Sequence, residues 1–159
     1  MDDYHKRTYG SVGEFVDDFR FMLRNRRQVH RAMQTITPAF RERLMLAVTQ
    51  VNGCRYCAYY HARMALREGM DHAEVQAMLQ GTVGTCPPEE ETAILYAQHW
   101  AETAAEPDPD ARAKVLEVYG EEKTQAIELF LQMIRMGNYM GNTFDYFLYR
   151  ISGGRWGNH

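Results

Sequence analysis

Two cysteines and a histidine stand at helical spacings near the middle of the chain. Cys54 and Cys57 are three residues apart, and His61 follows four residues later. On a helix these side chains share a face, so the two thiols can close a disulfide and the imidazole can accept the Cys57 proton, directly or through a water. The pattern indicates thiol–disulfide redox chemistry. Cys57 is the first candidate for deprotonation by His61, and the spacing leaves open which sulfur attacks.

The start of this segment favours a thiolate. If Asn52 caps a helix, Cys54 falls in the first turn, where free backbone N–H groups and the helix dipole stabilise an anion. Arg55 and Arg63 add positive charge nearby. A thiol with a pKa near 8.5 is only about 3% ionised at pH 7, whereas a pKa about 2 units lower makes the thiolate the main form. We therefore expect at least one of the two cysteines to have a lowered pKa.

A histidine that moves protons needs a partner that fixes its tautomer. The candidate is Glu42, which lies on the preceding, otherwise strongly apolar segment. Zinc binding is an alternative, because the two cysteines and His61 offer three ligands and Glu42, Cys86 or His99 could supply a fourth. Structural zinc sites usually take two ligands from each of two separate segments, which favours redox chemistry. Cys86, beside two prolines, is interpreted as a small buried apolar residue, and no metal is expected.

Helices are the elements that must position these residues. Two long stretches, 39–86 and 110–159, contain no proline. Capping signals mark helix starts after Ser11, Thr37, Asp71 and Asp108, and no strand-like alternation of any length is present. The sequence predicts an all-α fold with helices at 12–25, 38–51, 53–68, 72–80, 88–105, 109–119 and 121–150, the glycines at 69, 81 and 120 ending three of them.

The last predicted helix is apolar around most of its circumference, so we expect it to be buried within the protein or between subunits. Gly137 and Gly141 share one face, which would let another helix approach closely. Asn138 and Asn142 share a second face. These asparagines are either buried and hydrogen-bonded, which is the simpler interpretation, or line a pocket together with Tyr56.

The composition is that of a single globular domain over residues 1–159, with 45% apolar and 25% charged residues. No apolar run is long enough to span a membrane, and the polar N-terminus lacks a secretory leader, so a cytoplasmic location is expected. Residues 1–63 have a net charge of +5 and residues 64–159 one of −8. Without a groove-reading motif, this asymmetry predicts neither nucleic-acid nor membrane partners. It does provide complementary surfaces that could orient subunits in a homo-oligomer.

The arrangement Cys54-X-X-Cys57-X-X-X-His61, with Glu42 twelve residues before the first cysteine, resembles the AhpD-like alkylhydroperoxidases of the carboxymuconolactone decarboxylase superfamily. The match covers about residues 38–81, the redox core of the domain. The resemblance implies an all-helical bundle that assembles into trimers or hexamers. It also implies that Cys54 and Cys57 form the redox pair and that Glu42 and His61 form a proton relay.

The same resemblance implies a thiol-dependent peroxidase that needs no cofactor. Its substrate would be a peroxide, and an external dithiol or thiol protein would restore the cysteine pair. Tyr56 stands where AhpD itself commonly has histidine. The alternative is a non-catalytic redox sensor or binding protein of the same fold, whose disulfide state controls assembly or a partner.

Overall fold

A computed structural model describes residues 4–157 and contains seven helices and no strand within that range, which confirms the predicted all-α class. The first and last residues of the predicted domain, 1–3 and 158–159, lie outside the described range. No helix among the described residues combines the length and apolar character needed to cross a membrane. The helices are α1 (Val12–Arg24), α2 (Arg26–Thr35), α3 (Pro38–Asn52), α4 (Arg55–Arg67), α5 (His72–Leu79), α6 (Pro88–Glu102) and α7 (Pro109–Ile151).

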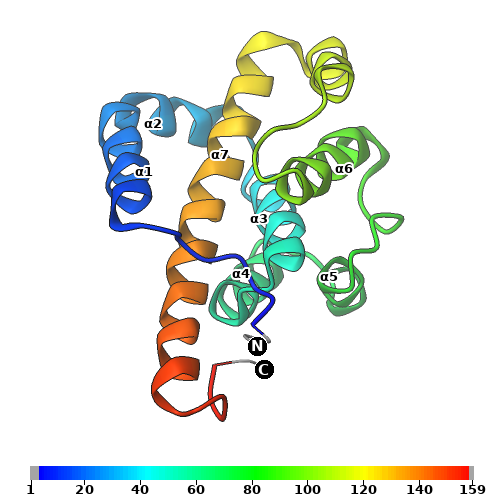
Figure 1. Ribbon diagram of the computed structural model, residues 1–159. Helices are drawn as coiled ribbons and strands as arrows, with labels where there is room; N and C mark the ends of the chain where they lie inside the picture. Colours follow the sequence, from blue (N-terminus) through cyan, green and yellow to red (C-terminus); the bar gives the residue numbers. More distant parts are fainter. Residues whose placement is uncertain (1–3, 158–159) are drawn as a thin grey trace.

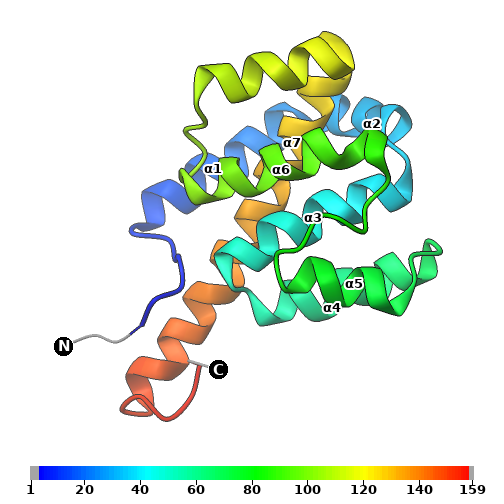
Figure 2. The same cartoon turned by 90° about the vertical axis from the view of Figure 1, so that its right-hand side faces the viewer.

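Helix α3 lies at the centre of the packing and contacts α4, α5, α6 and α7 (Figures 1 and 2). Its start follows the predicted capping signal, because the Phe40 backbone N–H donates to Thr37 Oγ1 over 3.3 Å and Pro38 occupies the first turn. Its apolar side chains form the middle of the core with those of α6 and α7. The candidate carboxylate Glu42 is therefore held on the most buried helix of the protein.

Helix α7 consists of two helical segments that meet at Gly120, whose φ of 74° and ψ of 170° are non-helical. A residue without a β-carbon adopts this conformation readily. Segment 109–119 lies over α6, and segment 121–151 runs the length of the molecule (Figure 2). The predicted division at Gly120 is thus confirmed. Of the apolar positions on the long segment, Ile127, Phe130, Leu131 and Ile134 are buried.

Helix α2 is absent from the sequence prediction, which ends the first helix at residue 25. Its sequence is strongly basic, and Asn25 makes no side-chain hydrogen bond as its cap. The helix is held by packing, since Val29, Ala32 and Ile36 contact the core at helical spacing and α2 packs along α7. Tertiary contacts therefore outweigh a weak local signal.

Helix α6 is also shorter than predicted. It ends at Glu102 rather than at residue 105, because Ala104 and Ala105 have positive φ values of 57° and 72°.

Candidate active site

The turn between α3 and α4 places the first cysteine at a helix N-terminus. Asn52 ends α3, Gly53 turns the chain with a φ of 69°, and Cys54 is itself the N-cap of α4. This corrects the expectation that Asn52 caps the helix. The Cys54 sulfur accepts the backbone N–H of Cys57 over 3.5 Å. A sulfur therefore occupies the position where helix N–H groups and the helix dipole stabilise negative charge.

The two sulfur atoms of the pair lie 3.1 Å apart, within hydrogen-bond distance of each other. Both cysteines are free. Cys54 is 1% exposed, whereas Cys57 is partly exposed. The predicted spacing thus brings the thiols together as a reduced pair, in which Cys57 is the less buried residue.

The negative charge of this pair resides on Cys54. The hydrogen bond from Cys57 lowers the pKa of Cys54 to about 6, and backbone N–H groups of Cys57 and Tyr56 act in the same direction. Burial and the negative charge of Asp145 oppose them. The pKa of Cys57 is raised because its proton is held by Cys54, and burial raises it further. At neutral pH Cys54 is therefore the thiolate and Cys57 keeps its proton.

Titration of the reduced protein should show this distribution directly. We expect the ultraviolet absorbance of thiolate to rise with one midpoint near pH 6, and the second thiol to ionise only at strongly alkaline pH. Cys54→Ser should remove the low midpoint and return Cys57 toward an ordinary pKa of about 8.5, because the neighbouring anion is gone. Two midpoints at the ordinary value in the parent protein would contradict the assignment.

His61 and Glu42 meet between α4 and α3. His61 Nδ1 lies 2.7 Å from Glu42 Oε2, and both side chains are largely buried. Arg41 Nε lies 3.4 Å from the other carboxylate oxygen. With Nδ1 bound to a carboxylate, Nε2 remains for proton exchange. Within residues 4–157 His61 makes no hydrogen bond to either sulfur, so a proton passing between Cys57 and His61 requires a bridging water or a side-chain movement.

The two glycines of α7 contact the cysteine pair. A β-carbon on Gly141 would lie 2.6 Å from Cys54 Sγ, and one on Gly137 would lie 3.8 Å from Cys57 Sγ. The face expected to admit another helix therefore receives the start of α4 from the same chain. Gly141 is needed for this approach, whereas Gly137 leaves room for a methyl group.

The two asparagines of α7 are fully buried and hydrogen-bonded. The Asn138 amide donates to Thr49 Oγ1 over 3.0 Å, and the Asn142 amide donates to the Asn52 carbonyl over 2.8 Å. Tyr56, the third residue of the suggested pocket, is 41% exposed. These hydrogen bonds join α7 to the end of α3, next to the cysteines.

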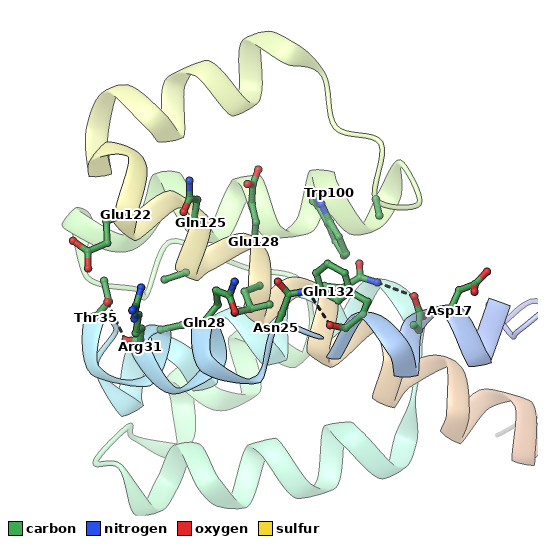
Figure 3. Close-up of a pocket in the computed structure, with 16 residues that line it drawn as sticks. Asp17, Asn25, Gln28, Arg31, Thr35, Trp100, Glu122, Gln125, Glu128 and Gln132 are labelled. Atoms are coloured by element: carbon green, nitrogen blue, oxygen red, sulfur yellow. Dashed lines mark hydrogen bonds between the residues drawn. The ribbon is translucent and has the colours of Figure 1, made fainter. Parts of the chain in front are cut away.

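Two hollows lie apart from these residues. A cavity of about 860 Å³ lies between the pair α1–α2 and the pair α6–α7 (Figure 3). Two of the carboxylates that line it are held in ion pairs, Glu128 with Arg112 at 2.8 Å and Asp18 with Arg135 at 3.1 Å. A groove of about 600 Å³ between the start of α1 and α7 is mainly apolar. Neither hollow is lined by a cysteine, by His61 or by Glu42.

The sequence pattern did not single out Asp145, a fully buried carboxylate beside Cys54. Its Oδ1 accepts hydrogen bonds from Arg55 Nη2 and from the Tyr56 hydroxyl, each over 2.7 Å. Lys6 Nζ lies 3.3 Å from Oδ2. The available signal was a single carboxylate within the aromatic run 144–149.

The zinc ligands considered from sequence do not assemble. In the part of the chain that the structure describes, no three His, Cys, Asp or Glu side chains are placed to hold a metal ion. Cys86 lies near Glu74 and Arg43, and burial raises its pKa to about 11. His99 instead contacts Asp108 at 3.3 Å. Two of the three proposed fourth ligands are thus engaged elsewhere.

The model of the carboxymuconolactone decarboxylase family matches residues 19–99. This range includes Glu42, both cysteines and His61, and α7 lies outside it. No curated protein and no solved structure matches the chain. The match covers just over half of the 159 residues and contains the whole cysteine–histidine–glutamate arrangement. The chain therefore belongs to the carboxymuconolactone decarboxylase family.

Proposed function

We propose that the protein is a thiol-dependent peroxidase, an AhpD-like disulfide oxidoreductase that reduces a peroxide with Cys54 and Cys57. The observation that carries the proposal is the pair of free sulfurs 3.1 Å apart, one held as a thiolate, beside a histidine bound to a buried glutamate. Membership of a family that includes alkylhydroperoxidases supports the reaction class. Groups with perturbed pKa values and a proton carrier beside them are typical of catalytic sites.

In the first step the sulfur of the partly exposed Cys57 attacks the peroxide. Its proton passes to His61 through a bridging water or after a side-chain movement, and Glu42 stabilises the resulting imidazolium. The sulfur then bonds to the terminal peroxide oxygen, the O–O bond breaks, and Cys57 becomes a sulfenic acid. The departing alkoxide takes the proton from His61 and leaves as the alcohol. This order assigns attack to Cys57 because Cys54, although the thiolate at rest, is closed to solvent.

In the second step Cys54 resolves the sulfenic acid. Its thiolate attacks the sulfur of Cys57, the S–S bond forms, and hydroxide leaves and takes up a proton to become water. The start of α4 favours the Cys54 thiolate in this step, because the Cys54 sulfur is the N-cap and accepts the Cys57 backbone N–H. An external dithiol then reduces the disulfide by thiol–disulfide exchange and is itself oxidised.

Steady turnover of a peroxide with a dithiol such as dihydrolipoamide tests the proposal. Variants of the two proton-relay residues make this test specific. We expect His61→Ala and Glu42→Gln each to reduce turnover by about 10²-fold or more, the size typical of a positioned proton carrier. Cys86→Ser, a cysteine apart from the pair, is the control and should keep the parent rate. Circular dichroism checks that the helices persist.

Two results would count against this assignment. A protein that consumes one equivalent of peroxide and then stops, even with excess dithiol, is a redox sensor rather than a peroxidase. If Glu42→Gln loses folded protein but keeps full activity per folded molecule, Glu42 has a structural role only.

We also propose that the protein forms a closed homo-oligomer, a trimer or hexamer by resemblance to the family, with α7 at the interface. The end of α7 projects beyond the other helices (Figure 2) and exposes Met140, Phe144, Phe147 and Ile151. An apolar face of this kind on a single subunit is typical of an interface. Light scattering should give a multiple of the 18.5 kDa chain mass, and a mass of 18.5 kDa at micromolar concentration would contradict the proposal.

A further inference from the structure

Asp145 binds both residues that separate the two cysteines. One oxygen of its carboxylate accepts hydrogen bonds from Arg55 and Tyr56, and the other lies 3.3 Å from Lys6 Nζ. The side chain is fully buried, and a buried carboxylate is costly unless several donors satisfy it. A single group on α7 thus ties together the first turn of α4 and the N-terminal segment.

The position of Asp145 on α7 brings its charge to Cys54. It lies one helical turn after Gly141, the residue whose backbone closely approaches the Cys54 sulfur. Lys6 packs against the turn between α3 and α4 that leads into Cys54, because a β-carbon on Gly53 would lie 3.6 Å from Lys6 Cγ. Among residues 4–157, the titratable groups around Cys54 include Tyr4 and Lys6 from the N-terminal segment, Arg55, Tyr56 and Cys57 from α4, and Asp145 from α7.

We propose that Asp145 is a positioning residue of the redox pair: it fixes the two residues between the cysteines and offsets the cations beside Cys54. The inference rests on the proposed dithiol–disulfide function. Without the carboxylate, Arg55 and Lys6 would stabilise the Cys54 thiolate further. A more stable thiolate is a weaker nucleophile, and it shifts the redox equilibrium toward the dithiol. Asp145 therefore limits how far the Cys54 thiolate is stabilised, and so keeps this thiolate reactive.

Asp145→Asn keeps the shape of the side chain and removes its charge. We expect the thiolate midpoint of Cys54 to fall by about half a pH unit or more, because a nearby anion disfavours a second anion. The direction of this change in the midpoint determines how the redox equilibrium changes. At pH 7 the variant gains thiolate stabilisation in the reduced form only, so its equilibrium with glutathione shifts toward the dithiol by about threefold. At pH 5, below both midpoints, the thiol is protonated in both proteins and the difference should nearly disappear.

Asp18→Asn is the matched control. Asp18 also accepts hydrogen bonds from a tyrosine and an arginine, Tyr9 at 2.8 Å and Arg135 at 3.1 Å, but it does not contact the cysteines. Its loss should change thermal stability and leave the thiolate midpoint in place. Arg55→Gln provides a second test of the inference if Asp145→Asn does not fold. Arg55 is 41% exposed, and removing its charge should raise the midpoint.

Equal midpoints in Asp145→Asn and the parent protein would overturn the inference, as would a redox shift of the same size at pH 5 and pH 7. The titration and the glutathione equilibrium use no peroxide, so the two proposals can fail separately. The expected shift in a protein that does not turn over peroxide would reject only the peroxidase function. An unchanged midpoint in an active peroxidase would reject only the role of Asp145.

Discussion

Replacing Cys57 with serine should lower steady peroxide turnover by about 10³-fold or more, the scale of loss seen when a catalytic nucleophile is removed. Cys57 is the partly exposed residue of the pair, and Cys54 is 1% exposed. Serine cannot form a sulfenic acid, so the first step is lost. Rapid-mixing measurements of peroxide consumption over a single turnover, without added dithiol, isolate this step.

Cys54→Ser is the informative partner of this variant. It should also fail to cycle, because no second sulfur closes the disulfide. Unlike Cys57→Ser, it should still consume one equivalent of peroxide and leave a sulfenic acid on Cys57 that dimedone traps. The reverse pattern, with the trapped sulfenic acid on Cys54, would move the attack to the buried sulfur and contradict the order of steps proposed here.

The second large effect is expected from Gly141→Ala. An added β-carbon would lie 2.6 Å from Cys54 Sγ and 3.2 Å from Tyr56 Cδ2, so the Cys54 side chain, the start of α4 or α7 must shift. We expect a loss of about 1–3 kcal/mol in the free energy of unfolding, as for overpacked cores, although alanine is the better helix former. We also expect turnover to fall by about tenfold or more, since displaced sulfurs no longer align.

Gly137→Ala is its control, one turn earlier on the same face. The added methyl group would lie at an ordinary contact distance of 3.8 Å from Cys57 Sγ. Helix propensity should then prevail and raise stability by up to about 1 kcal/mol, with turnover near the parent value. Urea unfolding and turnover measured on both variants make the comparison. If Gly141→Ala behaves like Gly137→Ala, the close approach to Cys54 is not a steric requirement.

The helices that could be predicted from the sequence are those with a local signal at their ends. Thr37 and Asp71 cap α3 and α5 as their residue types suggest, and Gly120 divides α7. Helix α2 lacks such a signal and depends on its contacts with α7. Its apolar positions at Val29, Ala32 and Ile36 were the only trace, within a strongly basic segment.

The same distinction holds for the candidate site. The contact between Cys54 and Cys57 follows from helical periodicity, and the contact of His61 with Glu42 follows from two adjacent helices packing together. Asp145 lies 90 residues from its partner Arg55, so its role depends on how α7 crosses the start of α4. No spacing of residues in the sequence indicates where α7 crosses the start of α4. The N-cap role of Cys54 was missed because Asn52 is the commoner capping type.

The unequal burial of the two cysteines also sets the course of the return half-reaction. A reductant thiolate reaches the disulfide at Cys57, so it forms a mixed disulfide there and Cys54 becomes the leaving group. The departing Cys54 sulfur is the N-cap of α4 and accepts the Cys57 backbone N–H, which stabilises its negative charge. The burial of Cys54 and its place at the start of α4 thus give the exchange one direction: the reductant forms its bond to Cys57, and Cys54 is released as an anion.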